Sequence, residues 1–444
     1  MNPFIFLWHI FSGLILFLWP IVGFIILARI TWVIWVHYVQ QDWISGITWT
    51  MLEIVPPREV LRSPKAMELF ISNAFYHWSM KGASEEYWQG SVWLWFSLEI
   101  ASIEGQVHFY IRTPSRIQGL VETQMYAQYP QAQVKVVEDY TLAIDDVSEK
   151  GGWKLWGCEF KMTKPFAFPL KTYVDYGLDS DIIQEENKVD PISSVIELFG
   201  SIGKGEQMWS QIIITPQKRA FHTRGTWFKS HDWVKEAQVQ IEDFLAPYTG
   251  VREKAGSPGE FSKDLRPPKH LDPAINAASL KMQKLGFDAG IRIAYVAKRE
   301  IFNMSNRRNI RTIWRQYAAP HSNELSRINS TQADAYADPD VDGFLAAWFL
   351  VPSKIVNQLE ERHLHAYRER EFFHLPMRHH LFNKHRLGWP ISPFIFPAYF
   401  HPELMVLNVE EIATMWHFPG QILKVPTLER IESKEAAPPT NLPT

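Results

Sequence analysis

The sequence predicts an α+β protein in which one N-terminal transmembrane helix is followed by ferredoxin-like antiparallel sheet units with helices on one face. Three observations predict this class. The N-terminus holds a long run without charged side chains, the region after it alternates between strand-type and helix-type patterns, and a tight-turn signal joins two neighbouring strands.

The composition is that of an ordered globular protein. The chain has 444 residues, of which 46% are hydrophobic and 21% charged, and its formal net charge is −3. This balance excludes a disordered chain and a protein whose whole surface is built to hold nucleic acid. The single cysteine, Cys158, excludes a disulfide framework and a thiolate zinc site.

A membrane anchor is predicted at the N-terminus. Residues 4–28 form a run of 25 residues without Lys, Arg, Asp or Glu, and a helix of that length measures about 37 Å against a hydrocarbon core of roughly 30 Å. A cleaved secretion signal would need basic residues before a shorter apolar run, and no Lys or Arg precedes Arg29. We assign residues 1–40 to an uncleaved anchor with an interfacial helix, and we expect interfacial helix to continue over the aromatic residues 30–55.

The flanks of this run predict its interface and its orientation. Arg29 is followed by Trp32, Trp35 and Tyr38, which are residue types that gather where a membrane meets water. Basic residues lie only on the C-terminal side of the run. The positive-inside rule then predicts a single-pass protein of the cytoplasmic membrane with the bulk of the chain on the cytoplasmic side.

Strand and helix patterns follow in a β-β-α-β order. Ser63-Pro64 first begins a helix with an apolar face. Strands are then expected over 94–102 and 107–113, joined by Glu104-Gly105, and a helix over 115–129 precedes a strand over 133–138. This order resembles half of a ferredoxin-like unit.

The rest of the chain predicts a second α+β region. Expected elements are strands over 153–163, 207–215 and 290–298 and helices over 191–199, 233–245, 274–285 and 310–317. Residues 249–273 are rich in Gly, Pro and charge, as linkers are. We therefore divide the chain into an α+β domain over 41–248, a linker over 249–273, a second α+β domain over 274–430 and an extended Pro-rich tail over 431–444.

No cofactor or metal site is expected. Gly200–Glu206 lacks the phosphate-loop spacing and leads from a helix into a strand, so a turn is the better interpretation. Asp338–Gly343 matches half of a calcium loop, but Phe349 stands where the bidentate Glu belongs. The dense histidines of 363–385 are interleaved with Arg and Lys, which oppose cation binding. Without a nucleophile–base pattern either, we expect that the chain is not an enzyme.

A basic helix offers an alternative function. Arg308, Arg311 and Arg315 recur at helical spacing, with apolar residues on the other side. Such a face could contact the phosphates of DNA or anionic lipid, which makes a membrane-tethered nucleic-acid-binding protein using the helix at 307–315 the alternative. A solvated helix face docked on a sheet explains the same spacing.

Longer stretches carry a family resemblance. WFSLEIASIEGQVHFYIRTP, VETQMYAQYPQAQVKVVEDY, LWGCEFKMTKP, LKTYVDYGLD and GKGEQMWSQIIITP resemble an uncharacterised family of bacterial single-span membrane proteins. They also resemble the non-catalytic N-terminal region of type IV secretion and conjugation-like ATPases. PPREVLRSPKAMELF and MWHFPGQILKVPTLERIESKEAAPPTNLPT are similar to the same family, so the resemblance runs from about residue 50 to 444.

The resemblance implies a partner and supplies no catalytic residues. It predicts a membrane-anchored, non-enzymatic scaffold or adaptor for a separate ATPase that moves DNA or protein across the envelope. The expected partners are the lipid bilayer and that ATPase, while direct contact with DNA and a homo-oligomer stay open. Trp416, His417, Phe418 and Pro419 are candidate partner contacts, and packing of the last helix on its own domain is the alternative.

Overall fold

The computed structural model describes most of the chain. It covers residues 3–57, 60, 62–76, 82–148, 150–180, 189–217, 221–222, 230–248, 251–253, 261–263, 269–331, 353–374 and 404–420. The calcium-loop motif at 338–343 and the tail over 431–444 lie outside these residues.

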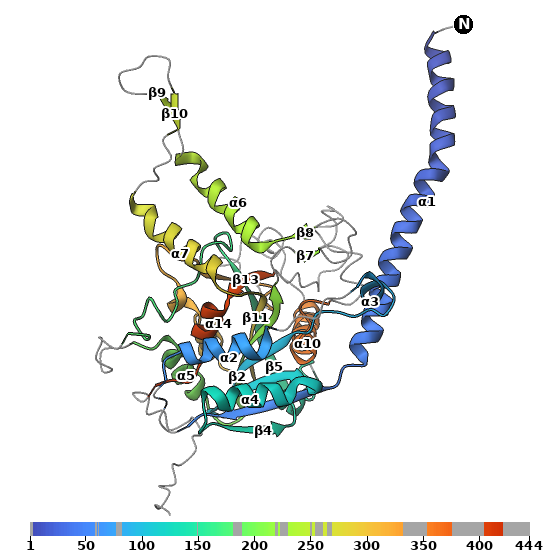
Figure 1. Ribbon diagram of the computed structural model, residues 1–444. Coiled ribbons are helices and arrows are strands. Elements are labelled where there is room, and N and C mark those ends of the chain that lie inside the picture. Colours follow the sequence, from blue (N-terminus) through green and yellow to red (C-terminus); the bar gives the residue numbers. More distant parts are fainter. Residues whose placement is uncertain are drawn as a thin grey trace, which may run out of the picture.

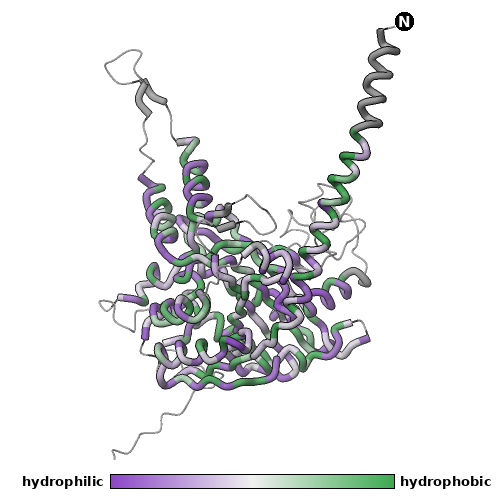
Figure 2. Tube along the Cα trace, turned by 45° about the vertical axis from the view of Figure 1, so that its right-hand side comes forward, coloured by the Kyte–Doolittle hydropathy of each residue, from purple (hydrophilic) through white to green (hydrophobic). Residues whose placement is uncertain are grey.

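One long helix, α1 (Pro3–Ser45), projects from the body of the protein (Figure 1). Its 43 residues correspond to roughly 65 Å of helix, so α1 exceeds the thickness of a bilayer core. One segment within the described residues, Leu18–Ser45, is long and apolar enough to cross a membrane, and Figure 2 shows hydrophobic residues along this part of α1. The predicted long apolar helix is therefore present, and it continues beyond residue 40.

The helix ends earlier than the aromatic stretch suggests. The Ser45 hydroxyl donates to the Asp42 carbonyl at 2.7 Å, and the N–H of Gly46 donates to the Trp43 carbonyl at 3.2 Å. Strand β1 (Trp49–Val55) follows. The expectation of interfacial helix up to residue 55 is wrong there, because this β-branched and aromatic sequence pairs with two other strands.

The body is built on one nine-stranded sheet whose pairs are all antiparallel. Its path is β12-β5-β11-β6-β2-β3-β1-β4, and β13 (Met405–Asn408) pairs with one end of β11. Within this sheet, two segments of the chain repeat a ferredoxin-like β-α-β-β-α-β order. The predicted α+β class with ferredoxin-like units is confirmed.

The first unit contains β1, α2 (Lys65–Phe75), β2 (Phe96–Ile103), β3 (Gln106–Pro114), α4 (Gln118–Gln128) and β4 (Gln133–Val137). The second contains β5 (Trp153–Met162), α5 (Pro191–Gly200), β6 (Glu206–Gln217), β11 (Gly286–Lys298), α8 (Met304–Ile310) and β12 (Leu325–Ile328). The units join through β2 and β6, whose residues Phe96–Ile103 pair with Gln207–Ile214.

The division at residues 249–273 does not separate two sheets. Strand β11, from the predicted second domain, lies between β5 and β6 of the predicted first domain. The described boundary between the repeated units falls instead between β4 and β5. Residues 249–273 belong to an excursion of the second unit between β6 and β11.

This excursion forms an arm, defined here as residues 233–283. Helices α6 (Trp233–Leu245) and α7 (Asp272–Gln283) pack beside one another, and the short strands β9 (Val251–Glu253) and β10 (Phe261–Lys263) pair beyond them (Figure 1). Phe168 contacts Phe244, near the C-terminal end of α6, with ring centroids 4.8 Å apart. Between β6 and the arm, β7 (Phe221–His222) pairs with β8 (Ser230–His231).

Helices cover the two faces of the sheet differently. The first face, which bears Leu98 and Ile212, forms the main core with α2, α4, α5, α8 and α14 (Val409–Met415). The second face, which bears Glu99 and Gln211, lies against α10 (Ser353–Glu369) and the segment after β4. The expected helical cover on one face is thus present, and α10 adds a cover on the other.

Candidate functional site

The base of α1 docks on the body at a site that we call the stalk junction, formed by residues 32–49 and 83–95 with 372–374. Val36 and Val39 of α1 are buried there. The indole N–H of Trp35 donates to the Tyr87 carbonyl at 3.0 Å, beside the short helix α3 (Ala83–Tyr87). Trp32 packs on the Tyr87 ring at 5.3 Å between centroids. The outer part of α1 therefore continues from a base that is fixed by directional contacts.

A glycine lets the chain approach α1 closely. Gly90 has φ +69°, a conformation that side chains other than glycine rarely adopt. A Cβ built on Gly90 would lie 2.0 Å from the carbonyl oxygen of Val39. Because that neighbour is backbone, a larger residue at position 90 would displace the helix.

An aromatic cluster extends the junction to the sheet. Trp49 and Trp95 lie 4.8 Å apart between ring centroids, and Trp95, Ile213 and Phe372 are buried together with Trp43 against them. The Arg112 guanidinium lies 4.4 Å above the Trp49 ring. Arg112 also donates to the Glu369 carbonyl at the end of α10, at 3.4 Å. The junction therefore connects α1, the sheet and the C-terminal end of α10.

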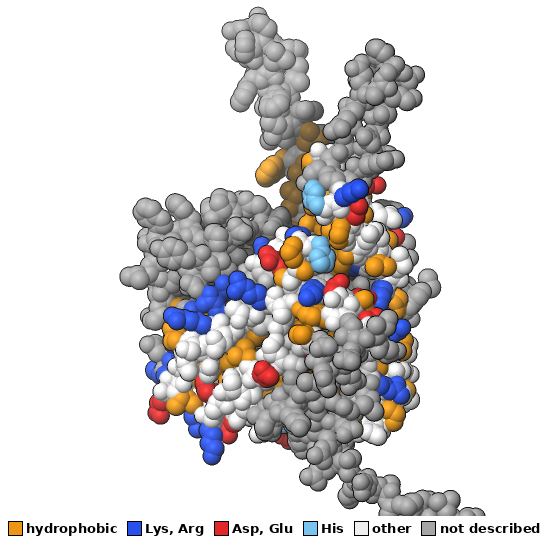
Figure 3. Space-filling view, turned by 90° about the vertical axis from the view of Figure 1, so that its left-hand side faces the viewer, with side chains coloured by type: hydrophobic (Ala, Val, Ile, Leu, Met, Phe, Trp, Pro, Cys, Tyr) orange, Lys and Arg blue, Asp and Glu red, His pale blue; other side chains and the backbone are white. Residues whose placement is uncertain are grey.

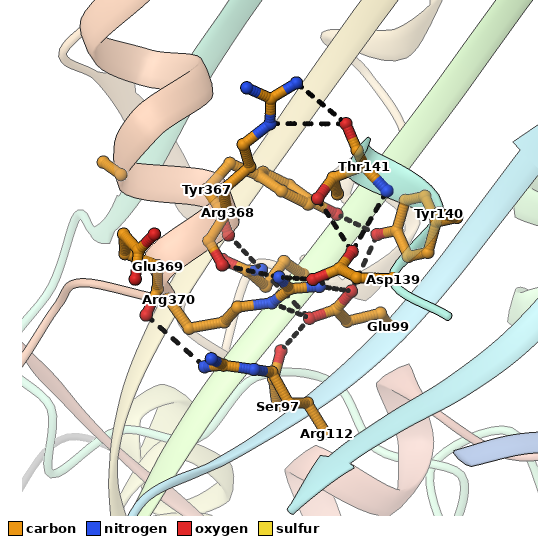
Figure 4. A network of polar contacts seen from close by, with 12 residues as sticks. Ser97, Glu99, Arg112, Asp139, Tyr140, Thr141, Tyr367, Arg368, Glu369 and Arg370 are labelled. Atoms are coloured by element: carbon orange, nitrogen blue, oxygen red, sulfur yellow. Dashed lines mark hydrogen bonds and ion pairs between the residues drawn. The ribbon is translucent and has the colours of Figure 1, made fainter. Parts of the chain in front are cut away.

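A buried charge network lies beside this junction (Figure 4). Arg370, just after α10, donates to the two carboxylate oxygens of Glu99 at 2.9 and 3.0 Å and is also paired with Asp139. The side chains of Arg370 and Glu99 are fully buried. Glu99 further accepts hydrogen bonds from neighbouring side chains: Ser97 at 2.5 Å, Tyr140 at 2.7 Å and Gln211 at 3.0 Å.

Through the carboxylate of Glu99, the network joins β2, β6, the segment after β4 and the residue that follows α10. Burial alone would lower the pKa of Arg370, but Glu99 and Asp139 outweigh it and hold that pKa well above its usual value. Burial alone would raise the pKa of Asp139. The charge of Arg370 and the hydrogen bonds from Arg370 and Thr141 outweigh the effect of burial, so the pKa of Asp139 is lowered. Both Glu99 oxygens are engaged, which leaves this carboxylate as a positioning group for α10 rather than a free acid or base.

A second buried pair holds the middle of α10. Arg292 on β11 donates to Glu159 on β5 at 2.6 Å and to the Ala366 carbonyl of α10 at 2.9 Å. His363 lies 3.1 Å from the Ile293 carbonyl, and burial together with Arg292 lowers the pKa of this imidazole to about 3. A Cβ at Gly157 would lie 2.3 Å from the His363 ring, so glycine is needed beneath α10.

The predicted membrane-interface residues lie along α1. Arg29 is exposed, whereas Trp32 and Trp35 divide their surface between solvent and α3. Tyr38 is 64% exposed. The sequence pattern did not indicate that Trp32 and Trp35 contact the body.

The predicted basic helix is broken. Helix α8 ends at Ile310, Arg311 is its C-cap, and Arg315 begins a separate 3-10 turn. The Thr312 hydroxyl donates to the Asn309 carbonyl at 2.9 Å, a local bond that competes with helix continuation. Arg308 and Arg315 are exposed, but Arg311 lies 5.9 Å from the Trp156 ring. The expected continuous helix over 310–317 is therefore wrong.

The predicted partner contacts lie in the core. Trp416, His417 and Phe418 are 0%, 1% and 2% exposed, and Pro419 is also buried. The Trp416 indole donates to the Glu99 carbonyl at 3.2 Å, and Phe418 packs on Tyr129 at 5.0 Å. These side chains are unavailable to a partner, because α14 lies within the helical layer of the first face. The alternative, packing on the chain's own domain, is what the structure has.

Buried ions fix this C-terminal segment. Lys281 of α7 pairs with Glu411 of α14 at 2.9 Å, and both side chains are fully buried. Burial lowers the pKa of Lys281 and raises that of Glu411, each opposed by the partner charge. Lys284 pairs with Glu68 at 2.8 Å and with Glu410 at 2.5 Å. Residues 404–420 are thus tied to α2 and α7.

Metal ligands do not gather in the described residues, where no group of three or more His, Cys, Asp or Glu could hold an ion. Of the histidine cluster, His363 is buried, His365 is exposed and the His374 ring lies 5.5 Å from Trp95, while 379, 380 and 385 fall outside the described part. Gly200–Glu206 is a turn between α5 and β6, as predicted. On the face shown in Figure 3, basic, acidic and apolar side chains are interspersed.

Comparison with known proteins gives no neighbour. No family model, no curated protein and no solved structure matches the chain.

The sequence did not reveal the Glu99–Arg370 network or the close approach at Gly90. One signal was present, because Glu99 is a charged residue in the middle of an apolar strand and such a residue is buried only when it is paired. Its partner lies 271 positions away, and spacing along the chain does not indicate it.

Proposed function

We propose that this protein is a membrane-anchored scaffold that holds its α+β body in a fixed orientation at the cytoplasmic face of a bilayer. The single observation that carries the proposal is the docking of α1 on the second face of the sheet. Val39 of the helix is buried against Gly90, and Trp35 donates to Tyr87. A helix that served only as a tether would not need directional contacts with the body.

The placement of the C-terminal segment supports a role in presenting a partner site. The stalk junction includes Ile213 and Phe372 of the second face, whereas α14 packs within the first face. His417 lies 3.1 Å from Asp190 at the start of α5, so residues 404–420 end on the side of the first face. The base of α1 and the last described residues therefore lie on opposite faces of one sheet.

We further propose that the recruited partner is a separate ATPase of the type IV secretion or conjugation-like class. The resemblance of residues 50–444 to the non-catalytic region of such ATPases supports this choice. In the scaffold, Glu99 and Arg370 have a positioning role, because their polar atoms are engaged with each other and with neighbouring elements.

The test is recovery of partners from native membranes. The detergent-solubilised full chain and a variant ending at residue 430 are purified by the same tag, and the retained proteins are identified. Recovery of an ATPase of this class with the full chain, and its loss with the shortened chain, is the expected result. Absence of any ATPase from both samples would contradict the proposal.

The exposure of Arg308 and Arg315 favours one second candidate, a membrane-tethered nucleic-acid-binding protein. It requires affinity for duplex DNA that falls steeply with salt. The double variant Arg308→Glu/Arg315→Glu is expected to abolish such binding, whereas Arg311→Gln, at the residue near Trp156, is the matched control. Equal affinity of the double variant and the parent would remove this candidate.

A further inference from the structure

A large aromatic side chain next to the stalk lies exposed on the body. Trp88, directly after α3, is 64% exposed. Its ring lies 5.7 Å from that of Trp35, in an edge-on arrangement. Trp35 in turn lies 6.5 Å from Tyr38. Trp88 therefore extends an aromatic group that begins on α1, although it belongs to a different element.

The charge-free run of residues 4–28 ends at Arg29, and we take this point as the edge of the hydrocarbon core along α1. Trp35 stands seven residues beyond Ala28, the end of that run, which corresponds to about 10 Å along the helix axis. Side chains on a helix lean toward its N-terminus, which here is the membrane side. The ring of Trp35, with Trp88 against it, is thereby brought toward the headgroup region, which extends roughly 5–7 Å beyond the hydrocarbon core.

The backbone on both sides of Trp88 is packed against α1. The Trp35 indole donates to Tyr87, the residue before Trp88, and Gly90 packs against the backbone of Val39. Insertion of α1 therefore delivers Trp88 to the membrane surface without further ordering of the chain. Trp is enriched at membrane–water interfaces, because its ring is apolar and its indole N–H is polar.

We propose that Trp88 is a second lipid contact, at which the body itself touches the headgroup region of the bilayer. The occupant of this surface is lipid, and the argument for it is the continuity of Trp88 with Trp35 and Tyr38 on the membrane helix. The inference rests on the proposed membrane anchoring. One helix alone leaves the body free to tilt with the helix, whereas a second contact beside it fixes the tilt.

The experiment places a fluorophore at single positions of the full chain in lipid vesicles. Cys158 is buried and is replaced by Ala, and cysteines are introduced by Trp88→Cys, Phe24→Cys and Val136→Cys. Phe24, 72% exposed in the apolar run of α1, reports insertion of the helix, and Val136, 62% exposed on β4, is the control on the body. Gln89→Cys repeats the measurement with Trp88 intact.

Quenching by lipids brominated at shallow and deep acyl positions gives the depth of each probe. We expect strong quenching at position 24, shallow quenching at 88 and 89, and none at 136. Quenching at 24 with none at 88 and 89 would overturn this inference and leave the anchor in place. Absence of quenching at 24 would overturn the anchor itself, and quenching at 136 equal to that at 88 would overturn a specific contact at Trp88.

Discussion

On the first face of the sheet, Leu98 and Ile212 lie in an apolar core beneath α2, α4, α5 and α14, and the buried Lys281–Glu411 pair joins α7 to α14. On the second face, the sheet residues Glu99 and Arg292 hold α10 and the adjoining Arg370 through buried hydrogen bonds and ion pairs. Apolar packing is strong but non-directional, and buried ion pairs with hydrogen bonds accept a narrow set of geometries. The stalk junction adjoins the second face. The difference suggests that the first face supplies the stability of the body, while the second defines the orientation in which the body meets α1.

The largest effect is expected on the second face. Arg370→Met would leave the Glu99 carboxylate buried without its cation, so we expect a loss of about 3–5 kcal/mol in the free energy of unfolding. Denaturant unfolding of the full chain in detergent measures this loss. Glu99→Gln combined with Arg370→Met should recover part of it, because no charge is then left unpaired. A loss below about 1 kcal/mol for the single variant would show that the network does not hold α10.

On the first face, Trp416→Ala is expected to cost a similar amount, about 3–5 kcal/mol, because the side chain is fully buried and leaves a cavity. Trp88→Ala is the matched control, with an expected loss of at most about 1.5 kcal/mol from the aromatic pair with Trp35. Equal losses at the two positions in the same unfolding assay would contradict the burial of Trp416.

The stability of the second face should depend on pH through one buried carboxylate. Glu360 of α10 is 3% exposed, and burial raises its pKa to about 7, against the opposing influence of Lys154, Arg299 and the Leu155 N–H. Because the folded state binds this proton more tightly than the unfolded state, Glu360 lowers stability increasingly as the pH rises from about 4.5 to about 7, and the loss is constant above that pH.

Removing the charge isolates this contribution. Glu360→Gln is expected to be more stable than the parent at pH 8 by on the order of 3 kcal/mol, with the gain vanishing near pH 4.5. Unfolding of both chains across pH 4.5–8 measures the difference, in which the separate contribution of His363 cancels. A gain that did not change with pH would contradict the raised pKa.

The smallest of these effects concerns the stalk junction. Gly90→Ala places a Cβ against the Val39 carbonyl and imposes an unfavourable φ, so we expect a loss of about 2 kcal/mol and displacement of α1 from α3. Gly82→Ala, where a Cβ meets nothing within 4 Å, is the control. Spin labels at Tyr38 and Gln89 would report the displacement as a longer or broader distance distribution. An unchanged distribution would mean that the docking at Gly90 is not tight.

Local patterns predicted the first ferredoxin-like unit closely. The Glu104-Gly105 signal yielded the hairpin, in which both residues have positive φ, and the predicted strand at 133–138 is β4. Strand β1 was missed because its residues follow the apolar α1 without a charge to mark the change. Only the three residues Gly46–Thr48 separate the two elements.

The sequence patterns did not predict which distant strands pair with one another. Residues 249–273 have the composition of a domain linker but lie within the excursion of 68 residues between β6 and β11, over 218–285, so a single sheet was divided in two. Trp416 and Phe418 are aromatic residues near the C-terminus that suit an interface and a core equally well. Their position was determined by α14 and its buried Glu411–Lys281 pair, whose members are 130 residues apart.

Extraction of native membranes with alkaline carbonate tests whether α1 holds this protein in a bilayer. We predict that the full chain stays in the membrane pellet, while a chain beginning at residue 46 is released into the supernatant. Release of the full chain by carbonate would contradict the anchor and, with it, the proposed scaffold.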